Sequence, residues 1–239
     1  MTSHSQPPPI DLLIHGWNPS GERFLKDYLS IHPDTSICLL TAGPITAPLP
    51  ALPEVPNLVH HTLALTQGAA LNTLAIGAPQ SAILLGDHTH SGDPSALDAR
   101  TMLAAMVLES RHPGCYVVAE LQDEANLPLA SDVGINHCVL PDHFTGAMLA
   151  QVTRHRGLSY FFDDLFEPGT GVQFQTRPAA ELTDSPDLFP IDCSQLVAHI
   201  MAHHTLALVG LKSDGSWLIP PPPGQDVRGR DVLLLITPQ

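Results

Sequence analysis

Short apolar runs alternate with helical patterns over residues 10–142 of the chain. Each run has the length of a strand and is apolar at nearly successive positions rather than at every second one. The six predicted strands are Asp11–His15, Ser36–Leu40, Leu58–Leu65, Ala82–Gly86, Cys115–Glu120 and His137–Leu140. Such strands alternating with helices are typical of a parallel sheet covered by helices on both faces. The pattern therefore predicts an α/β fold with a Rossmann-like doubly wound parallel sheet.

The helical segments show apolar positions three and four residues apart, which places them on one helix face. After the fourth strand, Asp93 has the position of an N-cap and Pro94 that of a first-turn proline. The apolar faces of the two clearest helices are Phe24, Leu25, Tyr28 and Leu29, and then Leu97, Thr101, Ala105 and Leu108.

A longer helical pattern runs from about Phe144 to Arg156 and leads into the aromatic stretch 158–166. These aromatic side chains present more apolar surface than a single helix end should expose. They therefore either pack in the core or form a self-association face. The candidate interface residues are Phe144, Met148, Tyr160, Phe161, Phe162, Leu165 and Phe166.

Residues 167–171, which include two glycines and a proline, predict a domain boundary. A helix over Ser194–His204 and strands over Thr205–Leu211 and Val232–Ile236 follow. A Ser-Asp-Gly turn at 213–215 before Trp217 adds hairpin character. The C-terminal part is therefore predicted to be a small α+β lobe.

The 239-residue chain is 44% hydrophobic and carries a formal net charge of −14, which indicates a folded protein and argues against nucleic-acid binding. No apolar run approaches the roughly 20 residues that span a bilayer, and no signal peptide is evident. We therefore expect a cytoplasmic protein. The four scattered cysteines lack a C-x-x-C pair, which favours buried reduced thiols over disulfides or a zinc site.

The first predicted strand leads into His-Gly-Trp-Asn-Pro-Ser-Gly at 15–21. Gly16 and Gly21 hold the first and third glycine positions of a dinucleotide-binding turn, but Asn18 replaces the second. Pro19 has no N–H to donate to a phosphate, and Trp17 adds bulk beside the phosphate path. The turn is therefore predicted to keep the chain geometry of a Rossmann-like lobe and not to bind a pyrophosphate.

An acidic residue that reads a ribose is expected at the end of the second strand, where this chain has Thr41. Binding of NAD in the usual way is therefore not expected, although the helix N-terminus could hold another anion or nothing. The candidate residues of this cleft are Gly16, Trp17, Asn18, Gly21, Thr41, Gly86 and Asp87.

The loop after the fourth strand holds the densest group of metal-ligand side chains, and it follows the carboxyl end of a strand, where ligands bind in open α/β sheets. The candidate metal ligands are Asp87, His88, His90 and Asp93. The carboxylates suit calcium and the imidazoles suit a transition metal, while the alternative is a solvated loop with Asp93 capping its helix.

A second histidine group lies in the C-terminal part, where His199 and His203 share a helix face and His204 follows. Asp192 is the one further candidate ligand, and a zinc site needs three or four convergent ligands. Surface histidines are therefore the favoured interpretation.

Four segments together resemble the RCK (regulator of conductance of potassium) family, most closely the cytosolic region of CASTOR/POLLUX-type ion channels. They are the Gly16-Trp17 turn, the acidic loop and helix start over 84–101, the stretch 133–166, and the C-terminal pattern from Ala207 to Ile236 with Gly229-Arg230-Asp231. Together they cover essentially residues 10–238.

This resemblance implies a Rossmann-like N-lobe at 10–142, crossover and dimerisation helices at 143–170, and an RCK C-lobe at 171–239. It also implies a ligand-sensing module of a cation or potassium channel or transport system, acting as a dimer or octameric ring with a membrane channel or transporter subunit at the inner face of the membrane. Family ligands include calcium and adenine nucleotides, but Thr41 departs from the ribose-binding pattern.

CASTOR-like channels carry transmembrane helices before this module, and the sequence shows none, so the chain is expected to be either a stand-alone regulator or an excised region. A non-enzymatic role is the favoured interpretation, because no nucleophile and base are found at supporting positions. The alternative is a Rossmann-fold NAD(P)-dependent oxidoreductase with a degenerate glycine motif.

Overall fold

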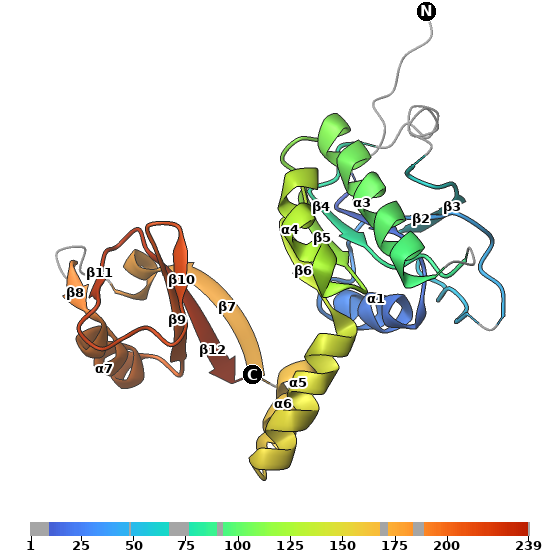
Figure 1. Cartoon of the computed structure of the whole chain (residues 1–239). Coiled ribbons are helices and arrows are strands. Elements are labelled where there is room, and N and C mark those ends of the chain that lie inside the picture. Colours follow the sequence, from blue (N-terminus) through green and yellow to red (C-terminus); the bar gives the residue numbers. More distant parts are fainter. Residues whose placement is uncertain are drawn as a thin grey trace, which may run out of the picture. The chain divides into compact units, whose positions relative to one another are not determined.

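The computed structural model describes residues 10–47, 49–66, 77–89, 93–167, 172–183 and 189–238. The chain divides into two compact units, Met1–His155 and Arg156–Gln239 (Figure 1). The division falls inside the segment 143–170 that the sequence assigns to crossover helices. The three-part division of the chain therefore stays a prediction.

The first unit is built on a six-stranded, wholly parallel sheet. Its strands are β1 (Leu12–His15), β2 (Ile37–Thr41), β3 (Leu58–Thr62), β4 (Ser81–Leu84), β5 (Tyr116–Glu120) and β6 (His137–Val139). The order β3-β2-β1-β4-β5-β6 is that of the doubly wound dinucleotide-binding fold. The predicted fold class is confirmed, and all six strands lie where the apolar runs placed them.

Helices α1 (Pro19–Ile31) and α3 (Pro94–Arg111) pack on opposite faces of this sheet. Leu12 and Ile14 of β1 share a core cluster with Leu25 of α1, whereas Leu13 shares the other cluster with Ala104 of α3. Side chains of a strand alternate between its two faces, so a strand covered on both sides is apolar at every position. This explains the continuous apolar runs.

The other helical segments among the described residues of the first unit follow β5 and β6. They are η1 (Glu124–Asn126), α4 (Leu127–Ala130), η2 (Ser131–Val133) and α5 (Pro141–Arg154). The N-cap prediction for α3 is confirmed, because Asp93 Oδ1 accepts a hydrogen bond from the Ala96 N–H at 2.8 Å.

The second unit contains α6 (Leu158–Phe166), β7 (Val172–Pro178), η3 (Ala179–Leu182), β8 (Ile191–Asp192), α7 (Cys193–His203), β9 (Ala207–Ser213), β10 (Ser216–Leu218), β11 (Asp226–Val227) and β12 (Val232–Pro238). Strands β10-β9-β12-β7 form an antiparallel sheet, and β11 pairs with β8. The core lies where Leu196 and Ile200 of α7 meet Leu211, Leu233 and Leu235. The predicted helix and strands of the C-terminal part are present, and β7 with the β8–β11 pair was missed.

Among the described residues, no helix is both long and apolar enough to cross a membrane. The four cysteines are free, with Cys38, Cys115 and Cys193 buried and Cys138 half-buried. Burial raises the pKa of all four thiols, which keeps them protonated near neutral pH.

Candidate functional site

The turn after β1 passes close to the loop that follows β4. Gly16 has a φ of +87°, and a Cβ placed on it would lie 2.5 Å from the carbonyl oxygen of Leu85. Only glycine combines this backbone conformation with such a close approach. Gly16 N–H donates to Leu40 O at 2.8 Å, which extends the ladder between β1 and β2 beyond the strand end.

Trp17 points into the core on the α1 side of the sheet and not toward a phosphate path. Its indole is fully buried in the cluster with Leu25 and Leu39, and Nε1 donates to Pro50 O at 2.8 Å. The structure therefore corrects the prediction that Trp17 adds bulk beside the phosphate path. A Cβ on Gly21 would lie 3.1 Å from Trp17 Cε3, so Gly21 allows α1 to pack closely on the indole.

Asn18, which replaces the second glycine, is the N-cap of α1. Its Oδ1 accepts from the Gly21 N–H at 3.0 Å. Its Nδ2 donates to Gly86 O at 3.1 Å and to Glu120 Oε2 at 2.8 Å. One side chain therefore joins the start of α1 to the loop after β4 and to the end of β5, and Pro19 takes the first helical position, where no N–H is needed.

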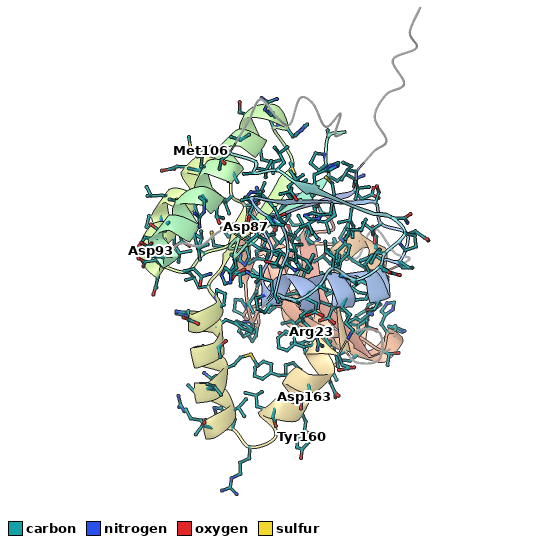
Figure 2. The ribbon with its side chains drawn as sticks, turned by 90° about the vertical axis from the view of Figure 1, so that its right-hand side faces the viewer. Arg23, Asp87, Asp93, Met106, Tyr160 and Asp163 are labelled. Atoms are coloured by element: carbon teal, nitrogen blue, oxygen red, sulfur yellow. The ribbon has the colours of Figure 1, made fainter. Side chains whose placement is uncertain are left out.

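The carboxylate of Asp87 occupies the space between the ends of β1, β2 and β4. Oδ1 accepts from Trp17 N at 3.4 Å and from Thr89 N and Oγ1 at 3.0 and 2.6 Å, and Oδ2 accepts from Ala42 N at 2.7 Å. Figure 2 shows Asp87 among closely packed side chains, whereas Asp93 and Met106 lie at the margin of the unit. The Asp87 carboxylate thus accepts hydrogen bonds from backbone N–H groups of both the glycine turn and the residue after β2.

Thr41, at the position of the expected ribose acid, is also engaged within the chain. Its Oγ1 donates to Gly43 O at 2.8 Å and lies 2.8 Å from His60 Nε2. Because a hydroxyl has one proton to donate, His60 Nε2 is the donor to Thr41. Burial, and then the neighbouring His61, lower the pKa of His60, while Asp87 opposes the shift. Neutral His60 of β3 therefore hydrogen-bonds the Thr41 side chain at the end of β2.

His15 ends β1 and faces α3, because Leu13 two positions earlier packs with Ala104 of that helix. Its side chain is 3% exposed, and within the described part of the chain neither ring nitrogen has a hydrogen-bond partner. Burial lowers the pKa of His15 from 6.5 to about 4; the Asp87 carboxylate opposes this shift and the Arg100 guanidinium adds to it. His15 is therefore a neutral imidazole at physiological pH.

Arg100 lies on α3, one turn before Ala104. Its Nε and Nη2 are buried and have no hydrogen-bond partner among the described residues. Sequence reasoning missed both His15 and Arg100. The signal for His15 was a single polar residue closing the apolar run Leu12–Ile14, but nothing local marked Arg100.

The comparisons with known proteins bear on this fold. No family model matches the sequence, and no curated protein matches it. Among solved structures, the human SLO3 gating ring matches with a TM-score of 0.69 at 13% identity, covering 95% of this chain and 44% of that one. The fold of this chain is therefore similar to that of the part of the SLO3 gating ring that it matches.

Two further solved structures match at TM-scores below 0.5. The GsuK RCK domain matches at 0.47 and 15% identity, covering 97% of this chain and 45% of that one. An NAD(P)-binding domain of an exopolyphosphatase-related protein from Archaeoglobus fulgidus matches at 0.43 and 11% identity, covering 61% and 99%. The chain spans less than half the length of the SLO3 and GsuK chains that it matches.

The structure gives no support to the prediction of a calcium or transition-metal site in the loop after β4. No group of three metal-binding side chains occurs in the part of the chain that the structure describes. Asp87 and Asp93 accept backbone N–H groups, His88 is exposed, and His90 lies outside the described residues. The observed role of Asp93 is the helix cap that the sequence offered as the alternative.

The histidines of the second unit lie close together without forming a metal site among the described residues. The rings of His199 and His203 have centroids 4.6 Å apart, and His204 Nε2 lies 3.0 Å from Leu182 O. Asp192 caps α7 by accepting from Ser194 N at 2.8 Å.

Helices α5 and α6 expose the side chains predicted to form an interface, and neither helix contains a buried residue. Phe144, Tyr160, Phe161 and Phe166 are exposed, whereas Met148, Phe162 and Leu165 are half-buried. In the first unit, Phe144 also lines an open groove of about 320 Å³ with Phe24, Leu85, Val118 and Val139. Its one carboxylate, Glu120, is bonded to Asn18 and Gln122. Phe144 is therefore both a lining residue of this groove and an exposed side chain of α5.

Proposed function

We propose that this chain is a ligand-sensing regulatory module of gating-ring type for a cation or potassium channel or transport system. The observation that carries the proposal is the match of 95% of the chain to the human SLO3 gating ring, across both units. The module would act as a dimer or ring whose arrangement changes when a ligand binds. A relation to the cytosolic regions of CASTOR/POLLUX-type channels is the finer part of this proposal and rests on the sequence patterns described above.

A second copy of this chain is the occupant that we propose for the groove at Phe144. Large exposed apolar patches on proteins usually mark interfaces, and Phe144 belongs both to the groove and to α5. The aromatic side chains of α6, Tyr160, Phe161 and Phe166, supply matching apolar groups for a symmetric pair.

The Phe144→Asp variant is expected to weaken self-association by about 2 kcal/mol or more, because a charge replaces an aromatic side chain that the second copy would bury. Light scattering across a concentration series measures this change. Met106→Asp is the matched control, since Met106 is 51% exposed on α3 and Phe144 is 50% exposed. A wild-type chain that is monomeric at high concentration, or equal effects of the two variants, would contradict the proposal.

Nicotinamide and adenine nucleotides are expected to leave the melting temperature unchanged. A pyrophosphate in this turn would need the backbone donors of Trp17 and Ala42, which Asp87 already uses, and Pro19 has none to offer. Thermal melts and calorimetry with NAD(H), NADP(H), ATP and ADP test this, because a ligand of the native state raises its stability. Nucleotide binding accompanied by turnover would instead support the oxidoreductase alternative.

A calcium titration in the same series tests the metal prediction at Asp87, His88, His90 and Asp93. Because Asp87 and Asp93 are occupied by backbone N–H groups, no calcium-dependent rise in melting temperature is expected from this loop.

A further inference from the structure

His15 and Arg100 lie in the same layer of the first unit, at the carboxyl end of the sheet. Leu13 and Ala104 share one core cluster. His15 lies two residues after Leu13 on β1 and so faces the same side of the sheet. Arg100 lies one helical turn before Ala104 on α3. The start of α3 lies at this end of the sheet, because Asp98 accepts from Gln122 N just after β5. The pKa of His15 responds to the Arg100 charge, in agreement with this placement.

The unpartnered atoms of Arg100 form one recognition edge of the guanidinium. Nε–H and the Nη2–H on the same side point in parallel, and this edge matches the two oxygens of an oxyanion. A guanidinium stays protonated in proteins, so its buried N–H groups need an acceptor. The neutral His15 ring adds one further N–H donor in the same layer.

The neighbouring carboxylates do not supply that acceptor. Both oxygens of Asp87 accept from Trp17, Ala42 and Thr89. Both oxygens of Asp98 accept from Gln122, Asp123 and Asn126. Among the described residues no ion pair to Arg100 occurs. The buried Nε–Nη2 edge of Arg100 and the buried imidazole of His15 therefore lie at one site. The described residues supply no acceptor to this edge of the guanidinium.

We propose that the first unit binds a small oxyanion, with phosphate as the probe ligand, between the Nε–Nη2 edge of Arg100 and the ring of His15. The site lies on the α3 face of the sheet, behind the glycine turn, and differs from the cleft that Asp87 closes. It stands independently of the proposed channel function, because it requires no partner chain.

Titration of the full chain with inorganic phosphate at constant ionic strength tests the proposal. Calorimetry is expected to show saturable binding, and the melting temperature is expected to rise with phosphate concentration. Arg100→Gln is expected to abolish both responses. Arg100→Lys, which keeps the charge and loses the fork, is expected to weaken binding about tenfold or more. Arg111→Gln removes the same charge from the exposed end of α3 and is expected to bind phosphate normally.

A measurement on the wild-type chain keeps the test valid if Arg100→Gln fails to fold. The Nε–H resonance of Arg100, assigned by its absence from Arg100→Lys, is expected to shift as phosphate is added. An ATP arm identifies the source of the anion. Binding of free phosphate without binding of ATP assigns a free oxyanion, and ATP binding that Arg100→Gln removes assigns a phosphate carried on a larger molecule.

Three results would overturn the proposal. They are an unchanged Arg100 Nε–H resonance throughout the titration, equal phosphate responses of wild type and Arg100→Gln, and a melting-temperature rise that sodium chloride reproduces at the same ionic strength. The chloride result would identify general charge screening of an acidic chain. The other two would mean that water or another part of the chain satisfies the guanidinium.

Discussion

Replacing Trp17 with alanine is expected to lower the free energy of unfolding of the first unit by about 3–5 kcal/mol. The indole is fully buried against Leu25 and Leu39, and its removal leaves a cavity under α1. Its Nε1 hydrogen bond to Pro50 O is lost at the same time. Urea denaturation followed by far-ultraviolet circular dichroism measures the loss without using tryptophan fluorescence.

The second tryptophan provides the control for this variant. Trp217 is 42% exposed in the second unit, and its one described partner is Lys212 Nζ, 6.0 Å from the ring centroid. Trp217→Ala is therefore expected to cost about 1 kcal/mol or less. Equal losses for the two variants would show that Trp17 does not anchor the turn to the core. The transitions of the two units are analysed separately, because a chain with two compact units need not unfold in one step.

Lowering the pH from 7 to 5 is expected to cost the wild-type chain about 2 kcal/mol of stability through His15 alone. The pKa of His15 is about 4 in the folded chain, against the ordinary histidine value of 6.5 that applies when the chain is unfolded. Between these values the unfolded chain binds the additional proton, so stability falls as the pH falls. The groups facing His15 are Asp87, which raises its pKa, and Arg100, which lowers it.

The His15→Leu variant is expected to lose most of this pH dependence, because leucine has no titratable group. A residual slope is expected from His60 and His112, whose pKa values are also lowered by burial. His137→Gln, which removes an exposed histidine at the start of β6, is expected to retain the wild-type profile. Urea midpoints from pH 7 to pH 5 measure all three proteins. A His15→Leu profile identical to wild type would contradict the assignment.

The elements of the first unit were predictable because their signals are local. Continuous apolar runs marked the six strands, and the Asp93-Pro94 pair marked the start of α3. In the second unit the strand β7 was missed. Its sequence Val-Gln-Phe-Gln-Thr-Arg-Pro alternates apolar and polar residues only briefly, and several of its side chains are exposed. The β8–β11 pair has two residues in each strand, which is too short for a periodic pattern.

The sequence placed the candidate cleft residues next to strand ends, but their binding role stays a prediction. Gly16, Asn18, Thr41, Gly86 and Asp87 do meet at the carboxyl ends of the strands. The sequence alone did not show that Asp87 would accept from Trp17 and Ala42, residues 70 and 45 positions away. Nor did it show that His60 would hydrogen-bond the Thr41 hydroxyl. Such pairings depend on side-chain directions that become defined only when the sheet has formed.

The sequence by itself determined the α/β class, the strand and helix positions of the first unit, and the loss of the second glycine of the turn. Periodicity, capping and glycine spacing decide these features within a few residues. The tertiary structure decided that Trp17 turns into the core, that Asp87 fills the cleft, and that His15 and Arg100 stay without partners among the described residues. The physical reason is that hydrogen-bond satisfaction in a buried site depends on every neighbour in space, and those neighbours come from distant parts of the chain.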